Sequence, residues 1–222
     1  MTGSSGKRPV SIVYAGGDDL FVVGAWDQTL ELAFDLHSAF DRFTGGRLTI
    51  SAGLVADDYH VPIHRLAEAA GEAEEAAKEH KRPDEEKDRN SIAPLFPGKP
   101  VPHHPSGRVR AVAFKWDDAR AMLTNFLEPA LGPLGRGNRP GTRVPRGLIY
   151  GLLGLTELWE EQGMLYLPRL AYMLARVDKR VRELPSWKPW RDYLMKHPQQ
   201  MAGFAPFVQW MDLIGRGGNG DE

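Results

Sequence analysis

Two adjacent aspartates, Asp18 and Asp19, follow Gly16 and Gly17 between two apolar runs in residues 10–26. Runs rich in Val, Ile, Phe and Tyr that are separated by a glycine pair predict a tight β-hairpin, because glycine enters positive-φ conformations without steric cost. Neighbouring carboxylates at one turn repel each other, and neither run contains a Lys or Arg to offset them. A divalent metal ion, Mg²⁺ or Mn²⁺, is therefore the expected partner, since one or two carboxylates and substrate phosphates commonly hold such ions.

Asp and Gly are also ordinary turn residues, so the GGDD sequence alone does not indicate a metal site. The segments after the hairpin support the metal interpretation. Asp27 is the expected N-cap of a helix that a glycine pair ends. Alternating apolar residues then predict a strand within residues 47–56. A second helix is expected over residues 62–81, with Glu74 and Lys78 paired at i, i+4. This order of elements is that of a nucleotide-cyclase or polymerase palm.

The same motifs resemble the second palm domain of the large subunit of type III CRISPR effector complexes. The resemblance is carried by YAGGDDLFVVG, LTISAGLVA, the lysine-bearing helix EAAKEHKR and NSIAPLF, in this order. Three later segments resemble the carboxy-terminal helical domain of that subunit in the Csm branch: AVAFKWDDARAML, PRGLIYGLLGLTELWEE and LYLPRLAYMLARV. The expected fold class is therefore α+β, with a partial ferredoxin-like palm over residues 8–100 and an all-α helical domain over residues 107–216.

The resemblance implies an enzyme, a nucleotidyltransferase that makes cyclic oligoadenylates from ATP when the complex has bound target RNA. Asp18 and Asp19 are the expected metal ligands and catalytic residues. Gly16 and Gly17 would let the triphosphate approach the backbone. Lys78 resembles the lysine with which palm-type cyclases hold substrate phosphates, although a cation in the last turn of a helix also complements the helix dipole.

A ferredoxin-like palm is built β-α-β-β-α-β, and only about nine residues precede the strand that leads into the GGDD sequence. We expect the first strand and helix to come from an upstream segment or a separate chain, and the isolated chain to be inactive. A catalytically silent interaction subunit of the same complex is the alternative, although the intact GGDD favours catalysis. A diguanylate-cyclase-like enzyme is a weaker alternative, because DDLF replaces the DEF pattern of that family. The His-Asp pair of the family's nuclease motif is not found.

Composition restricts the remaining possibilities. The 222 residues include no cysteine, which excludes disulfides and thiolate metal sites, and no apolar run approaches the roughly 20 residues that cross a bilayer. These features predict a cytoplasmic location. Residues 1–82 carry 8 basic and 13 acidic side chains, whereas residues 120–216 carry 14 basic and 8 acidic. The basic half is expected to face guide or target RNA or other protein subunits. Four arginines lie in a Gly/Pro-rich loop that is either solvated or clamps RNA phosphates: Arg136, Arg139, Arg143 and Arg146.

Overall fold

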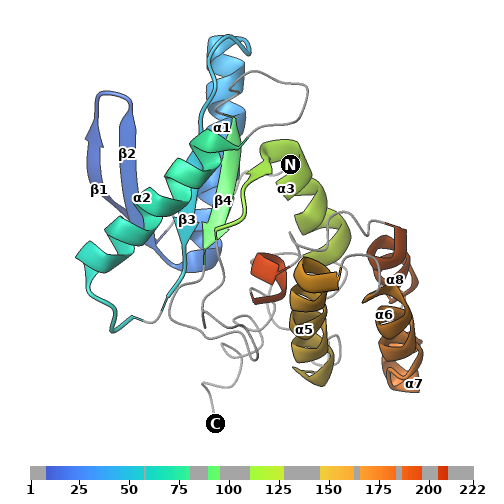
Figure 1. The fold of residues 1–222 in the computed structure, drawn as a ribbon. Coiled ribbons are helices and arrows are strands. Elements are labelled where there is room, and N and C mark those ends of the chain that lie inside the picture. Colours follow the sequence, from blue (N-terminus) through green and yellow to red (C-terminus); the bar gives the residue numbers. More distant parts are fainter. Residues whose placement is uncertain are drawn as a thin grey trace.

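The computed structural model describes eight stretches of the chain: residues 9–57, 59–80, 90–95, 111–127, 146–162, 166–183, 187–196 and 205–209. The strands are β1 (Val10–Gly16), β2 (Asp19–Gly24), β3 (Ala52–Val55), β4 (Ser91–Leu95) and β5 (Phe114–Lys115). The helices are α1 (Trp26–Thr44), α2 (Ile63–Glu79), α3 (Trp116–Met122) with the π-helical turn η1 (Leu123–Leu127), α5 (Arg146–Gln162), α6 (Tyr166–Ala175), α7 (Lys179–Arg182) and α8 (Trp187–Lys196) (Figure 1). The predicted α+β class, a palm followed by a helical region, is confirmed.

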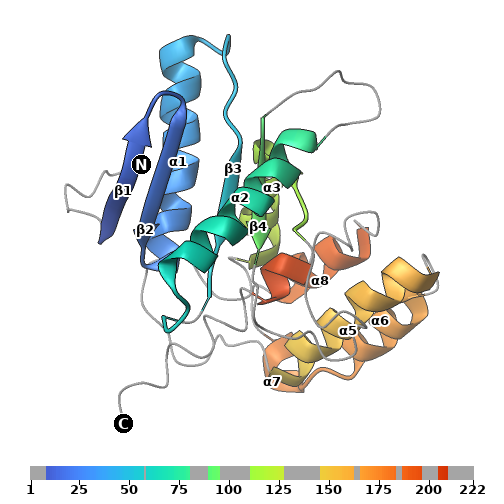
Figure 2. The same ribbon diagram turned by 60° about the vertical axis from the view of Figure 1, so that its left-hand side comes forward.

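The hairpin predicted around the GGDD sequence is present. Strands β1 and β2 pair antiparallel, and their last pair is Gly16 with Asp19, so Gly17 and Asp18 form the turn. Gly17 has φ 62°, a conformation that favours glycine over any residue with a Cβ. Figure 2 shows this two-stranded ribbon alongside α1, the helix that follows β2.

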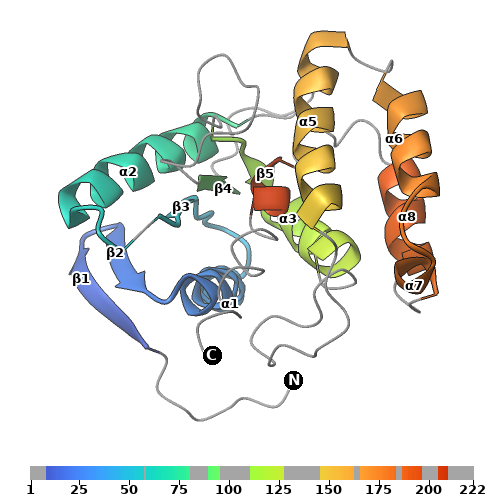
Figure 3. The same ribbon diagram turned by 90° about the horizontal axis from the view of Figure 1, so that it is seen from below.

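A second sheet holds β3, β4 and β5 in that order. Strands β3 and β4 run parallel and are joined through α2, whereas β5 pairs antiparallel with β4. Figure 3 shows β3 between α2 and α1. The side chains agree with this layering, because Ala73 and Ala77 of α2 pack with Ala93 on one face. On the other face, Leu54 and Ile92 join a larger core.

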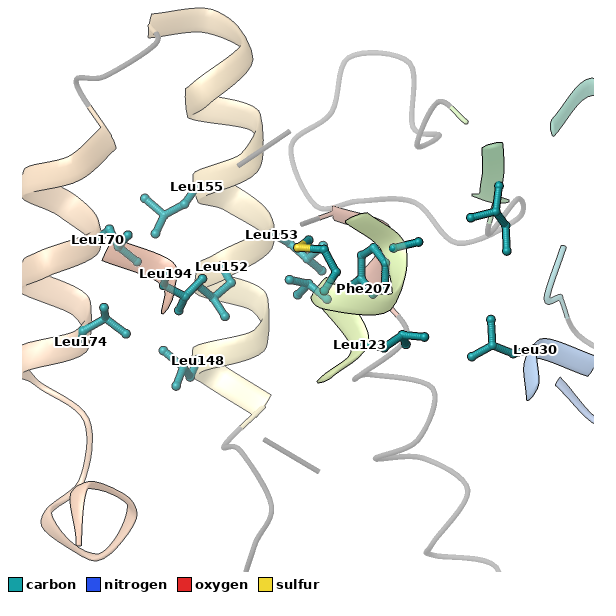
Figure 4. Packing of buried hydrophobic residues seen from close by; sticks show 14 of the residues in the cluster. Leu30, Leu123, Leu148, Leu152, Leu153, Leu155, Leu170, Leu174, Leu194 and Phe207 are labelled. Atoms are coloured by element: carbon teal, nitrogen blue, oxygen red, sulfur yellow. The ribbon is translucent and has the colours of Figure 1, made fainter. Parts of the chain in front are cut away.

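The larger core continues from the palm into the helical region. It contains Leu30 and Phe34 of α1, Trp116 of α3 and the leucines of α5, α6 and α8 (Figure 4). Trp116 is at the junction: its ring meets Phe34 edge-on at 5.5 Å, and its indole N–H donates to the Ile50 carbonyl at 2.9 Å. The ring of His37 also stacks on Trp116, with 4.5 Å between the ring centroids, so His37 packs at this junction.

Two boundaries differ from the sequence predictions. The strand after α1 covers only Ala52–Val55 of the predicted range 47–56, and the Ile50 carbonyl just before it accepts a hydrogen bond from the Trp116 indole N–H. The N-cap of α1 is Ala25 rather than Asp27, which lies in the first turn, where its charge suits the helix dipole. Within and after the segment LYLPRLAYMLARV, α6 ends at Ala175 and a separate short helix, α7, begins at Lys179, with the Asp178 carbonyl accepting from the Arg182 backbone N–H.

The predicted domain boundary, near residues 101–106, and three of the loop arginines, Arg136, Arg139 and Arg143, lie outside the described residues. The two-domain division therefore stays a prediction. None of the helices in the described ranges combines the length and apolar character needed to cross a bilayer.

The seat of α2 on β3 gives the first testable prediction. A Cβ at Gly53 would lie 2.2 Å from the Ala70 carbonyl oxygen and 2.4 Å from the Glu74 backbone nitrogen. Gly53→Ala should therefore push the helix off the sheet and lower the free energy of unfolding by about 1–3 kcal/mol. Gly71→Ala is the matched control, because nothing lies within 4 Å of its Cβ position. That change should raise stability by up to about 1 kcal/mol. Urea denaturation measures both, and an undiminished stability of Gly53→Ala would refute the contact.

Candidate functional site

The tip of the β1–β2 hairpin presents both predicted aspartates to solvent. Asp18 occupies the turn and Asp19 opens β2, and both residues are exposed. Nothing lies within 4 Å of the Cβ position of Gly17, so the backbone between the strands is open to an approaching ligand. Of the described residues, none forms an ion pair with either aspartate. The two carboxylates are thus adjacent, hydrated and available to a cation.

Tyr14 is a neighbour of this tip that the sequence interpretation missed. Its phenol ring covers Gly16: a Cβ at that glycine would lie 2.9 Å from the Tyr14 hydroxyl oxygen and 3.1 Å from the ring carbon that carries it. The signal was available, because residues two apart on a strand face the same side. Gly16 therefore makes room for Tyr14, whereas Gly17 leaves open backbone.

Lys78 lies in the last turn of α2, and its Nζ is 2.8 Å from Glu74 Oε1. This confirms the predicted i, i+4 pair. The hydrogen bond to Glu74 raises the pKa of Lys78 above its ordinary value, partial burial opposes the rise, and the negative charges of Glu74 and Asp19 add to it. The charge of Asp19, on the hairpin tip, thus acts on a lysine of α2 although 58 residues lie between the two in sequence.

The ribbon arrangement agrees with this electrostatic link. Figures 1 and 2 show the hairpin tip and the carboxyl end of α2 at the same end of the molecule. The position of Lys78 along the sheet follows from Gly53, which brings the Glu74 backbone, one turn before Lys78, against β3. Packing of α2 on β3 thus fixes where the lysine-bearing helix lies relative to the rest of the palm.

The residues present fit a divalent metal that also binds a phosphate ligand. In the described part of the chain no group of three or more His, Cys, Asp or Glu side chains converges on one point. A cage built from protein ligands alone is therefore not formed there. Two exposed carboxylates with a nearby ammonium suit the other common arrangement, in which Mg²⁺ keeps several waters and shares its remaining positions with substrate phosphates.

Comparison with known proteins gives a family match for the amino-terminal part of the chain. Residues 4–93 match the family described as Cas10/Cmr2, second palm domain. This part of the chain is thus similar to the second palm domain of Cas10/Cmr2 proteins. The match contains the GGDD hairpin, α1, β3, α2 and the start of β4, and it confirms the resemblance to the large subunit of type III CRISPR effector complexes.

Relatives extend the similarity beyond the palm. The chain is 32% identical over 170 residues to the single-strand-specific deoxyribonuclease Cas10/Csm1 (subtype III-A) of Thermococcus onnurineus. This match covers 75% of this chain and 20% of that protein. Among solved structures, the Csm1–Csm4 cassette in complex with one ATP is similar at 27% identity and TM-score 0.57. The cassette in complex with pppApApA is similar at 28% identity and TM-score 0.59. Each match covers 88% of this chain and 27% of the other. The chain thus spans about one-fifth of the curated relative's length.

The electrostatic link between α2 and the hairpin gives the second prediction. Glu74→Gln should lower the pKa of Lys78, and Asp19→Asn should lower it by a smaller amount, because Glu74 contributes both a hydrogen bond and a charge. Titration of ¹³C-labelled lysine side chains by NMR measures the pKa. Glu72→Gln, on an exposed position of the same helix, is the control and should leave the pKa unchanged.

The same shift fixes a pH dependence. Because the folded-state pKa of Lys78 is raised, its contribution to stability is complete below the pKa of an unfolded lysine, about 10.4. The contribution is lost as the pH rises through the folded value, so the stability difference between the wild type and Glu74→Gln should shrink there. If Asp19→Asn left the pKa of Lys78 unchanged, the hairpin tip and α2 would be electrostatically independent.

Proposed function

We propose that the hairpin tip and Lys78 form the nucleotide site of an enzyme that joins ATP into cyclic oligoadenylates. In this proposal the chain acts as part of the large subunit of a type III CRISPR effector complex, in the cytoplasm. The observation that carries the proposal is the hairpin tip itself, where Gly17 has a positive φ and the adjacent Asp18 and Asp19 are both exposed. The negative charge of Asp19, which adds to the raised pKa of Lys78, supports the inclusion of that lysine. Solved relatives in complex with ATP and with pppApApA support the choice of nucleotide.

Asp18 and Asp19 are the residues that would hold Mg²⁺ or Mn²⁺. When bound there, such an ion supplies charge neutralisation at phosphate oxygens and favours deprotonation of an attacking hydroxyl. The aspartates take this role because they are adjacent, exposed and free of ion pairs in the described part of the chain. Their mutual repulsion makes the tip a poor environment for two anions unless a cation is present.

Lys78 would bind the phosphates of the nucleotide. Its Nζ lies 2.8 Å from Glu74 Oε1, and its raised pKa keeps the ammonium charged throughout the physiological range. A triphosphate offers more negative charge than one carboxylate, so Lys78 can exchange Glu74 for phosphate oxygens without leaving its helix position. In the transfer reaction a 3′-hydroxyl oxygen bonds to the α-phosphorus, the bond to the β-phosphate breaks, and pyrophosphate leaves with its charge partly offset by Lys78.

A catalytically silent interaction subunit remains the second candidate function, and one observation favours it. Strand β2 pairs only with β1, and β3 pairs only with β4, among the described strands. Both therefore carry an unpaired edge, which suits contact with another palm segment, upstream or in a separate chain. Other protein subunits and, through them, guide and target RNA are the further proposed partners. A diguanylate-cyclase-like activity has no structural observation in its favour.

The third prediction tests the aspartates. Asp18→Ala combined with Asp19→Ala should reduce oligoadenylate synthesis by the assembled complex about 100-fold or more, because several kcal/mol of charge stabilisation are lost. Chromatography of the products measures the change. The control is Glu68→Gln with Glu72→Gln, which removes two exposed charges from α2. Undiminished synthesis by the aspartate variant would remove the basis of the proposal.

The fourth prediction concerns the chain by itself. With Mg²⁺ and ATP the 222-residue chain should make little product. The described site consists of a few side chains on an exposed tip, and β2 and β3 each leave one edge unpaired among the described strands. The same chromatographic assay, run beside the assembled complex, measures the difference. Robust synthesis by the chain alone would mean that the described residues suffice for catalysis.

A further inference from the structure

Residues 166–196, which contain α6, α7 and α8, carry an excess of positive charge. These residues include eight Lys or Arg and three Asp or Glu, whereas the rest of the chain has 20 basic and 26 acidic residues. Figures 1 and 3 show the three helices side by side, on the side of the molecule away from the GGDD hairpin. This excess is therefore separate from the proposed nucleotide site.

Helix α6 turns its apolar side inward and its basic side outward. Leu170 and Leu174 are buried, and Figure 4 shows both facing the leucines of α5. Arg169, Tyr172 and Arg176 are exposed, and their i, i+3, i+7 spacing places them on one side of the helix. We call these three residues the α6 face. Its two arginines lie about 10 Å apart along the helix axis.

The α6 face combines an aromatic ring with two arginines. Tyr172 is 61% exposed, the Arg176 guanidinium carbon lies 5.3 Å from its ring centroid, and Arg176 Nη1 donates to the Tyr172 hydroxyl. Neither Arg169 nor Arg176 forms an ion pair with a carboxylate of the described residues. The guanidinium groups therefore keep their capacity for an anionic ligand, and the arginine contact holds the ring in place.

We propose that the α6 face binds single-stranded RNA. Guanidinium forks match phosphate oxygens, and an exposed ring stacks on an unpaired base, which a duplex would conceal. RNA loops and ends display unpaired bases, whereas cellular DNA is chiefly duplex. A hydrophobic protein partner fits less well, because the exposed positions beside these residues are the small Pro168, Ala171 and Ala175. This inference is independent of catalysis at the hairpin.

The test measures binding of the full chain to a fluorescein-labelled 20-nucleotide oligouridylate by anisotropy over a series of salt concentrations. Arg169→Glu with Arg176→Glu should weaken binding at least 10-fold and reduce the slope of log K against log salt by about 1.4, the value for two phosphates of a single strand. Tyr172→Ala should weaken binding about 10-fold, whereas Tyr172→Phe, which keeps the ring, should retain it. Circular dichroism checks that each variant is folded.

The control is Arg42→Glu with Arg65→Glu, a change of equal charge at exposed positions of α1 and α2. It should alter affinity less than threefold. Asp18→Ala with Asp19→Ala should leave RNA binding intact, which separates this inference from the proposed nucleotide site. The proposal is overturned if the chain does not bind the oligouridylate, if the α6-face variants bind as the control does, or if a duplex, a matched DNA strand or an acidic peptide binds more tightly.

Discussion

The backbone contact between Gly53 of β3 and α2 is the constraint on which the candidate site depends. With only a hydrogen at this position, the Ala70 carbonyl and the Glu74 amide come close to the strand. The alanines of α2 complete the contact, since Ala73 and Ala77 are fully buried against Ala93. Small side chains thus bring a helix near a sheet, and the turn that carries Lys78 follows directly from the turn held at Gly53. A bulkier residue at either surface would move the ammonium relative to the hairpin.

Electrostatic balance at the tip follows from this packing. Two neighbouring carboxylates are unfavourable on their own, and Asp19 acts electrostatically on Lys78, a basic residue of a different element. Glu74 holds that lysine by a hydrogen bond and raises its pKa together with Asp19. The arrangement has too little positive charge to neutralise both aspartates, since Lys78 is already shared with Glu74. It is therefore suited to accept a further cation and a polyanionic ligand together.

The palm and the helical region share one hydrophobic core, which gives the chain two surfaces on a common frame. Trp116 joins them, with Phe34 and His37 of α1 against its ring and the Ile50 carbonyl on its indole nitrogen. Beyond it, α5 and α6 bury their leucines against each other. The apolar sides of these helices are buried in the core, so their charged sides face outward. The acidic hairpin and the helix that carries the basic α6 face lie on opposite sides of the molecule.

Local sequence patterns were enough to predict the individual elements and the chemistry of the tip. The GGDD turn, the glycine end of α1 and the Glu74–Lys78 pair depend on neighbours within about four residues, so periodicity and turn chemistry predict them. The motif order also predicted the α+β class. Tertiary structure added what local patterns do not contain, such as the hydrogen bond from the Trp116 indole N–H to the Ile50 carbonyl just before β3, between residues 66 positions apart. It also decided that Lys78 senses Asp19, because that proximity arises from helix-to-sheet contact between segments far apart in the chain.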